Sequence, residues 1–75
     1  GQFSVEYSLP KSSKVQLGIY NMLGQQVAQL HQGQQPKGKH QHQWMPLKHG
    51  GSVNYYICRL TVNGKDFSQP VILRH

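Results

Sequence analysis

Two histidines, His40 and His42, are separated by one residue in the sequence Lys39-His40-Gln41-His42. If this segment is extended, their side chains point to the same face, and a facing strand could bring His31 or His49 beside them. Imidazole is a common ligand of zinc and other divalent metals. However, no carboxylate or second cysteine stands at metal-ligand spacing. We therefore expect partly buried polar side chains here, with no metal site and no cofactor.

Catalytic chemistry is not expected from the remaining reactive residues. Glu6 and Asp66 are the only acidic residues and lie near opposite ends of the chain, so nothing indicates the paired carboxylates of a glycosidase. Cys58, the only cysteine, lies in an apolar segment where a buried thiol is usually inert. No serine or cysteine has the flanking residues of a nucleophile elbow. We predict that the protein is not an enzyme.

The basic residues are dispersed along the chain. Eight lysines and arginines against two acids give a formal charge of +6 at pH 7. Such a charge favours polyanionic partners, such as lipid surfaces, acidic glycans or nucleic acid. Because the lysines do not gather on one predicted strand face and no recognition helix is indicated, we do not expect a nucleic-acid partner.

Two aromatic residues, Trp44 and Tyr20, are candidates for carbohydrate binding, since sandwich modules with exposed aromatic side chains accompany secreted glycosidases. Trp44 follows Gln41 and Gln43 in an alternating segment, and it lies on the face that we expect to be core. A solvent-facing Trp44 would favour sugar binding, and a buried one would favour a structural role.

These residues must be positioned by β-strands, and the clearest signal is a hairpin over residues 14–30. Val15, Leu17 and Ile19 alternate with polar or small residues, which is the period of a half-buried strand. Asn21 and Gly24 then occupy the first and last positions of a four-residue turn. The returning strand is predicted to end near His31, followed by a glutamine-rich loop over residues 32–37.

Other segments have the same character. Residues 3–9 alternate and are stopped by Pro10, and His40, His42 and Trp44 share one face of a further strand. A loop containing Gly50 and Gly51 is expected over residues 47–52. No run of about 20 apolar residues is present, so we predict no membrane-spanning segment.

The last third of the sequence predicts a second hairpin. Residues 55–62 are almost continuously apolar or aromatic, which indicates a central strand covered on both faces. Asn63-Gly64 is a strong two-residue hairpin signal. The final strand, residues 66–74, contains Pro70 and should therefore lie at a sheet edge or a bulge.

Together these segments predict a single all-β domain over residues 1–75, a small immunoglobulin-like antiparallel β-sandwich of six to seven strands. Tyr56 lies two residues before Cys58, as the tyrosine-corner residue does in immunoglobulin domains, and Trp44 could fill the core opposite. Two aromatic core residues in an unrelated sandwich would give the same pattern.

The motifs also resemble a known family. The segments that carry this are Tyr-Ser-Leu-Pro-Lys (7–11), Val-Gln-Leu-Gly-Ile-Tyr-Asn-Met-Leu-Gly-Gln-Gln-Val (15–27), Gly-Lys-His-Gln-His-Gln-Trp (38–44) and Tyr-Ile-Cys-Arg-Leu (56–60). The chain resembles the type A C-terminal sorting domain of type IX secretion, the Por secretion tail. That domain is similar to the immunoglobulin-like domain of flagellar hook-capping proteins. The family usually carries apolar residues where His40 and His42 stand.

The resemblance implies a non-catalytic C-terminal sorting and anchoring module, excised from a larger exported protein of a Gram-negative bacterium. Such a protein crosses the periplasm and the outer-membrane translocon, and is then secreted or held at the cell surface. The implied partners are the outer-membrane secretion machinery and a neighbouring domain of the parent. The expected recognition residues are Val71, Ile72, Leu73 and Arg74. The alternatives are a structural spacer and a carbohydrate-binding accessory sandwich of an extracellular enzyme.

Overall fold

The computed structural model describes residues 2–45 and 53–74, which form six antiparallel strands and no helix. The strands are β1 (Phe3–Leu9), β2 (Ser13–Tyr20), β3 (Gln26–Gln35), β4 (Gly38–Trp44), β5 (Val53–Val62) and β6 (Lys65–Arg74). β1 pairs with β4 in one sheet, and the other sheet has the order β3-β2-β5-β6. The predicted all-β sandwich is confirmed.

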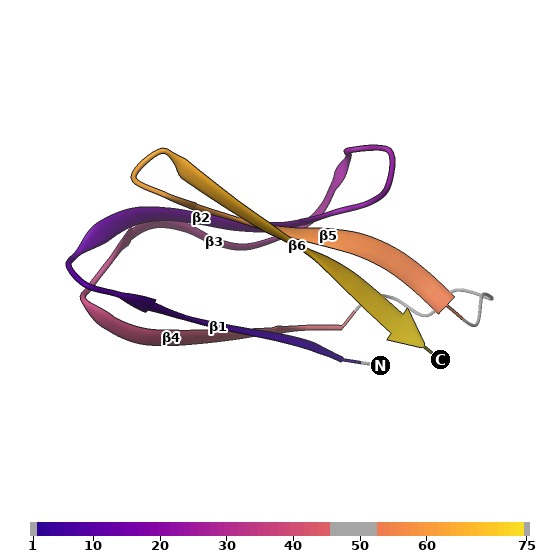
Figure 1. Cartoon of the computed structure of the whole chain (residues 1–75), viewed down its shortest axis with the longest axis horizontal. Coiled ribbons are helices and arrows are strands. Elements are labelled where there is room, and N and C mark those ends of the chain that lie inside the picture. Colours follow the sequence, from indigo (N-terminus) through magenta and orange to yellow (C-terminus); the bar gives the residue numbers. More distant parts are fainter. Residues whose placement is uncertain (1, 46–52, 75) are drawn as a thin grey trace.

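The two sheets form two layers, with β1 and β4 lying across one face of the larger sheet (Figure 1). In immunoglobulin-like sandwiches, strands B and E share one sheet, and strands C, F and G share the other, to which C′ is added in variable-type domains. Here β1 and β4 take the places of B and E, and β3, β2, β5 and β6 those of C′, C, F and G. The described residues contain no counterparts of strands A and D.

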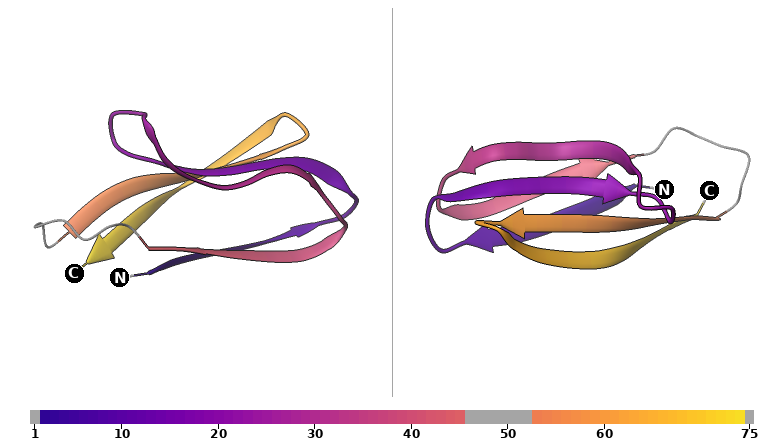
Figure 2. Two further views of the ribbon diagram at one scale, coloured as in Figure 1. Left: turned by 180° about the vertical axis from the view of Figure 1, so that it is seen from behind. Right: turned by 90° about the horizontal axis from the view of Figure 1, so that it is seen from above.

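The core is centred on β2, which lies between β3 and β5 in the larger sheet (Figure 2). Val15, Leu17 and Ile19 are 0%, 1% and 0% exposed, so the predicted apolar face is confirmed. The main cluster of buried side chains comprises Leu17, Ile19, Cys58, Val71 and Leu73.

The predicted turns have the expected backbone. The Asn21 side-chain Oδ1 accepts hydrogen bonds from the Leu23 and Gln25 amides at 2.9 and 3.0 Å, and Gly24 has a φ of +84°. Asn63 and Gly64 both have positive φ, as a two-residue hairpin of mirror-image type requires. These residues therefore set where β2 turns into β3 and where β5 turns into β6.

The predicted loop over residues 32–37 is wrong for most of its length, because β3 continues to Gln35. The glutamine-rich segment keeps pairing with β2, with Gln35 opposite Ser13. Register shifts beside Gly18 and Tyr20 absorb extra residues of β3, as β-bulges do. Gln35 is buried and 7% exposed, because a hydrogen-bonding partner from the other sheet meets it there.

β5 is central, as predicted, but only one of its faces is covered, since Tyr55 is 56% exposed. β6 is an edge strand with Pro70 opposite Ile57, which confirms that prediction. The predicted loop over residues 47–52 lies outside the described residues. None of the described segments forms a helix with the length and apolar character needed to cross a membrane.

Candidate functional site

The sequence-predicted recognition residues lie at the end of β6, and the alternation of the strand divides them. Val71 and Leu73 are 2% and 6% exposed and belong to the core, whereas Ile72 between them is 56% exposed. Arg74 is the last residue of β6 and lies opposite Val53 in the backbone register. Ile72 and the unpaired backbone edge of β6 are therefore the accessible features of this segment.

Ile72 has an apolar neighbour on the outer face of the larger sheet, the face turned away from β1 and β4. Tyr55 lies opposite Ile72 in the register, and both are 56% exposed. In the next row, Ile57 lies opposite Pro70. Two exposed apolar side chains lying side by side offer a small area that another apolar surface can cover. We name this feature the Tyr55–Ile72 pair.

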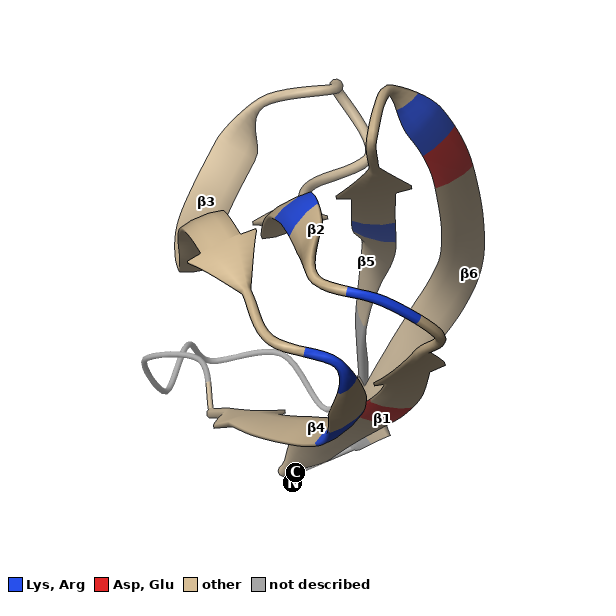
Figure 3. Ribbon diagram, turned by 90° about the vertical axis from the view of Figure 1, so that its left-hand side faces the viewer, with Lys and Arg blue, Asp and Glu red and all other residues tan. Residues whose placement is uncertain are grey.

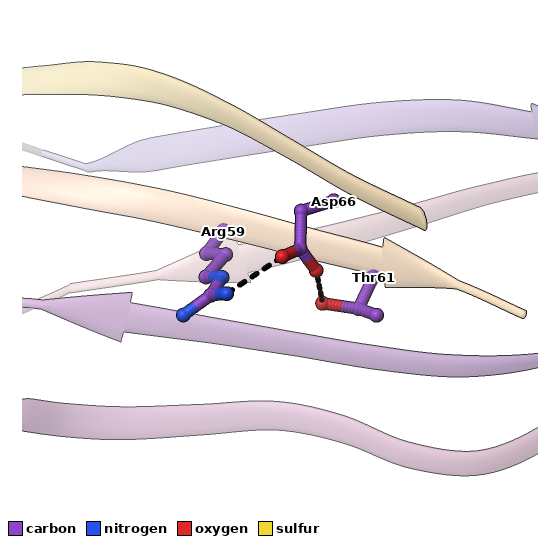
Figure 4. Close-up of polar contacts among 3 residues, drawn as sticks. All are labelled: Arg59, Thr61 and Asp66. Atoms are coloured by element: carbon purple, nitrogen blue, oxygen red, sulfur yellow. Dashed lines mark hydrogen bonds and ion pairs between the residues drawn. The ribbon is translucent and has the colours of Figure 1, made fainter. Parts of the chain in front are cut away.

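Further along the outer face lies the ion pair shown in Figure 4. Arg59 Nη2 lies 2.7 Å from Asp66 Oδ2, and the Thr61 hydroxyl donates to Asp66 Oδ1, also at 2.7 Å. The hydrogen bond from Arg59, followed by the one from Thr61, lowers the pKa of the Asp66 carboxyl. The hydrogen bond between Arg59 and Asp66 also raises the pKa of the Arg59 guanidinium. Both side chains are about half exposed to water, so the ion pair orients them on the surface but contributes little to the stability of the fold.

A hollow lies beside this ion pair and crosses the four strands of the larger sheet. We name it the outer-face trough, and its lining includes Gln16, Gly18, Tyr20, Gln29, Gln32, Arg59, Thr61 and Asp66. Leu17, Gln26 and His31 complete the lining, and sequence analysis considered only Tyr20, as a sugar contact, and His31, as a metal ligand. Gln32 was missed because residues 32–37 were predicted to form a loop, whereas Gln16 and Gln29 lie in predicted strands and carry no sequence signal of a site. Gly18 was an available signal, since a glycine inside a strand often marks a close approach.

The predicted side-by-side placement of His40 and His42 is found at the inner face of β4, around Tyr7 of β1. The ring centroid of Tyr7 lies 5.6 Å from that of His40 and 5.9 Å from that of His42. The Tyr7 hydroxyl donates to Gln35 Oε1 at 2.5 Å, and His42 Nε2 lies 3.3 Å from the same hydroxyl. We name these residues, with His31, the inter-sheet polar cluster.

His31 of β3 comes within a ring-centroid distance of 5.9 Å of His42. However, the Nε2 atoms of His31 and His40 already contact the carbonyls of Gly33 and Pro36. Across residues 2–45 and 53–74, no three His, Cys, Asp or Glu side chains are grouped to hold a metal ion. His49, the other histidine considered for such a site, lies outside the described residues.

The surroundings of His42 are unfavourable for its protonated form. Burial, followed by the proximity of His31 and His40, lowers the pKa of His42 below its usual value. Burial also raises the pKa of the Tyr7 hydroxyl, which the hydrogen bond to Gln35 partly offsets. Both groups are therefore held neutral at pH 7, as hydrogen-bonded polar groups between two sheets should be.

Trp44 and Cys58 both belong to the sandwich interior. Trp44 is partly buried and meets Tyr56 of the opposite sheet edge-to-face, with ring centroids 4.9 Å apart. Cys58 is 3% exposed, and burial raises the pKa of its thiol, which disfavours the reactive thiolate. The position of Trp44 favours a structural role over a sugar platform.

The described basic residues are spread over separate elements, as Figure 3 shows. In comparisons with protein-family models, curated proteins and solved structures, nothing matches this chain.

Proposed function

We propose that this chain is a non-catalytic C-terminal sorting and anchoring module that directs a parent protein through the type IX outer-membrane translocon. The sequence motifs at residues 7–11 and 15–27 support this function. The structural observation that carries it is the geometry of β6, a free edge strand that exposes Ile72 between two buried anchors. The parent is then secreted or held at the surface of a Gram-negative bacterium, after passing through the periplasm.

A receptor can recognise such a strand by β-strand addition, in which it adds a strand of its own to the edge of the sheet. A receptor that pairs with the open edge of β6 gains backbone hydrogen bonds, and a pocket for the exposed side chain adds specificity. Val71 and Leu73 hold the strand on the sheet while Ile72 is presented. Pro70 lacks an N–H group and so limits uncontrolled pairing of the same edge with other chains. The receptor is the outer-membrane secretion machinery.

The test uses a reporter enzyme with this chain fused to its C-terminus, expressed in a bacterium that has a type IX system. Ile72→Ser should reduce the exported fraction several-fold, because it removes the presented side chain and leaves both anchors in place. Phe67→Ser is the matched control, since Phe67 is 50% exposed on the same strand. Thermal unfolding of each purified variant checks that the fold is retained.

Two results would count against the proposal. One is export of Ile72→Ser at the level of the unchanged fusion, and the other is an equal loss in Phe67→Ser. Deleting residues 71–75 is a less discriminating experiment, because it also removes Val71 and Leu73 from the core. A loss of export after that deletion would report unfolding as well as lost recognition.

A structural spacer is the second candidate, and the exposed Tyr55–Ile72 pair favours it, because an apolar pair can pack against a neighbouring domain of the parent. The position in the parent distinguishes the two functions. A sorting module ends the polypeptide, whereas a spacer can be internal. Mass spectrometry of the secreted parent would also show whether the module is removed.

A further inference from the structure

The outer-face trough is separate from residues 71–74, the part of β6 that we propose is recognised. Its lining comes from all four strands of the larger sheet, whose outer side is seen from above in Figure 2. Neighbouring strands lie about 4.8 Å apart, so three intervals between strands span about 14 Å. The trough is therefore long enough for a short oligomeric ligand lying across the strands.

Gly18 allows two side chains to lie close against the sheet. A Cβ at this position would come within 2.8 Å of Gln26 Nε2 and 3.2 Å of the Tyr20 ring. The Tyr20 ring and the Gln26 amide therefore occupy the space above the glycine backbone. An aromatic ring held against a sheet in this way is a preorganised contact surface.

Four glutamine amides, those of Gln16, Gln26, Gln29 and Gln32, are the most frequent polar groups of the trough. Gln29 donates a side-chain hydrogen bond to the Gln32 amide oxygen, which orients both groups and leaves further donors and acceptors free. Arg59 is the only lysine or arginine among the described lining residues, and Asp66 neutralises it at 2.7 Å. Despite the basic character of the chain, this surface matches a neutral ligand.

We infer that the outer-face trough binds a neutral oligosaccharide. Tyr20 stacks on the apolar face of a sugar ring, while the amides of Gln29 and Gln32 and the free guanidinium N–H groups of Arg59 bond to ring hydroxyls. Each of these side chains offers paired donors or acceptors that suit neighbouring hydroxyls. This function goes beyond sorting and is independent of it, because its residues lie away from residues 71–74.

The experiment records ¹H–¹⁵N NMR spectra of the labelled full chain during titration with cellohexaose, xylohexaose and laminarihexaose at about 0.15 M salt. At least one of these neutral oligosaccharides should shift the backbone amides of Gly18, Gln29 and Arg59 in a saturable way. Dextran sulfate is titrated in parallel, to separate this binding from general attraction of a polyanion to a basic protein.

Matched variants then locate the binding. Tyr20→Ala and Gln32→Ala should each weaken the affinity about tenfold or more, which is about 1.4 kcal/mol. Tyr55→Ala should leave it unchanged, because Tyr55 is an exposed aromatic on the same face that does not line the trough. Gly18→Ala should also weaken binding, since its methyl group would displace Tyr20 and Gln26. Unfolding temperatures check the fold of each variant.

Three results would overturn the inference. One is the absence of saturable shifts at these amides with all three oligosaccharides at about millimolar concentration. Another is unchanged affinity in Tyr20→Ala together with Gln32→Ala. The last is binding of dextran sulfate alone that disappears at high salt, which would assign the surface to polyanions. Export of a Tyr20→Ala fusion is unaffected if the two functions are separate.

Discussion

The two sheets of this sandwich are built from the same kind of strand and yet have different interiors. In the four-stranded sheet, β2 has neighbours on both sides, and its Val15, Leu17 and Ile19 are at most 1% exposed. In the two-stranded sheet, β1 pairs with β4 alone among the described strands, and its inward residues Phe3 and Val5 remain partly exposed. Both strands of the smaller sheet therefore have an open edge.

The difference shows that alternation alone does not determine how deeply a strand is buried. The inner face of a strand becomes fully buried when the strand has neighbours on both sides and an opposing layer covers that face. The smaller sheet supplies less cover, and its interface with β3 includes the inter-sheet polar cluster. We conclude that the four-stranded sheet supplies most of the buried core, whereas the smaller sheet packs on it through partly buried apolar side chains and through the inter-sheet polar cluster.

The largest predicted effect is the loss of a side chain from the centre of the larger sheet. Leu17→Ala should cost about 2–5 kcal/mol of unfolding free energy. Domains of this size typically have a stability of about 3–5 kcal/mol, so this variant should be largely unfolded. Val5→Ala in the smaller sheet should cost about 1 kcal/mol, since Val5 is partly exposed.

Urea unfolding followed by far-ultraviolet circular dichroism measures both variants. Equal losses in Leu17→Ala and Val5→Ala would contradict the proposed difference between the sheets. A greater loss in Val5→Ala would reverse it.

The next effect concerns the polar cluster itself. Tyr7→Phe should destabilise the protein by about 1–2 kcal/mol, because buried Gln35 loses its hydroxyl donor. Hydrogen exchange should show lower protection in β1 and β4 and little change in β2 and β5. Tyr55→Phe, at an exposed position, is the control. Equal loss of protection in both sheets would show that they unfold as one unit.

Acid should weaken the contact between the sheets. The pKa of His42 is lowered in the folded state by burial and by His31 and His40, so the unfolded chain binds its proton more readily. Stability should therefore fall as pH decreases through about 6.5, the unfolded value, towards the lower folded value. The groups facing His42 are Tyr7, His31 and His40.

Unfolding temperatures measured between about pH 8 and pH 5 test this, and His42→Gln should flatten the dependence. An equally steep acid response in His42→Gln would assign the effect to other groups.

The smallest effect is expected from the exposed ion pair on the larger sheet. Asp66→Asn should leave the urea midpoint unchanged within error, because Arg59 and Asp66 are about half exposed to water. A clear loss of stability would show that polar contacts on the outer face matter as much as those between the sheets. The contrast with Tyr7→Phe makes this a direct test.

The candidate surfaces were predicted less completely than the fold. Residues 71–74 were expected to form one recognition segment, but the register turns Val71 and Leu73 inward and leaves Ile72 outside. The outer-face trough could not be predicted, because its residues come from distant parts of the sequence. The two register shifts between β2 and β3 decide which glutamines reach it.

The sequence by itself determined that the chain forms β-strands, the turns at Asn21 and Asn63-Gly64, and the buried face of β2. Each of these depends on alternation or on the backbone preferences of adjacent residues, which are local properties. Only the tertiary structure decided that β3 continues to Gln35 and that Tyr7 meets His42 and Gln35. Polar residues such as glutamine have no strong preference for a strand or a loop. Their partners in the neighbouring strand or in the opposite sheet therefore determine which structure they adopt.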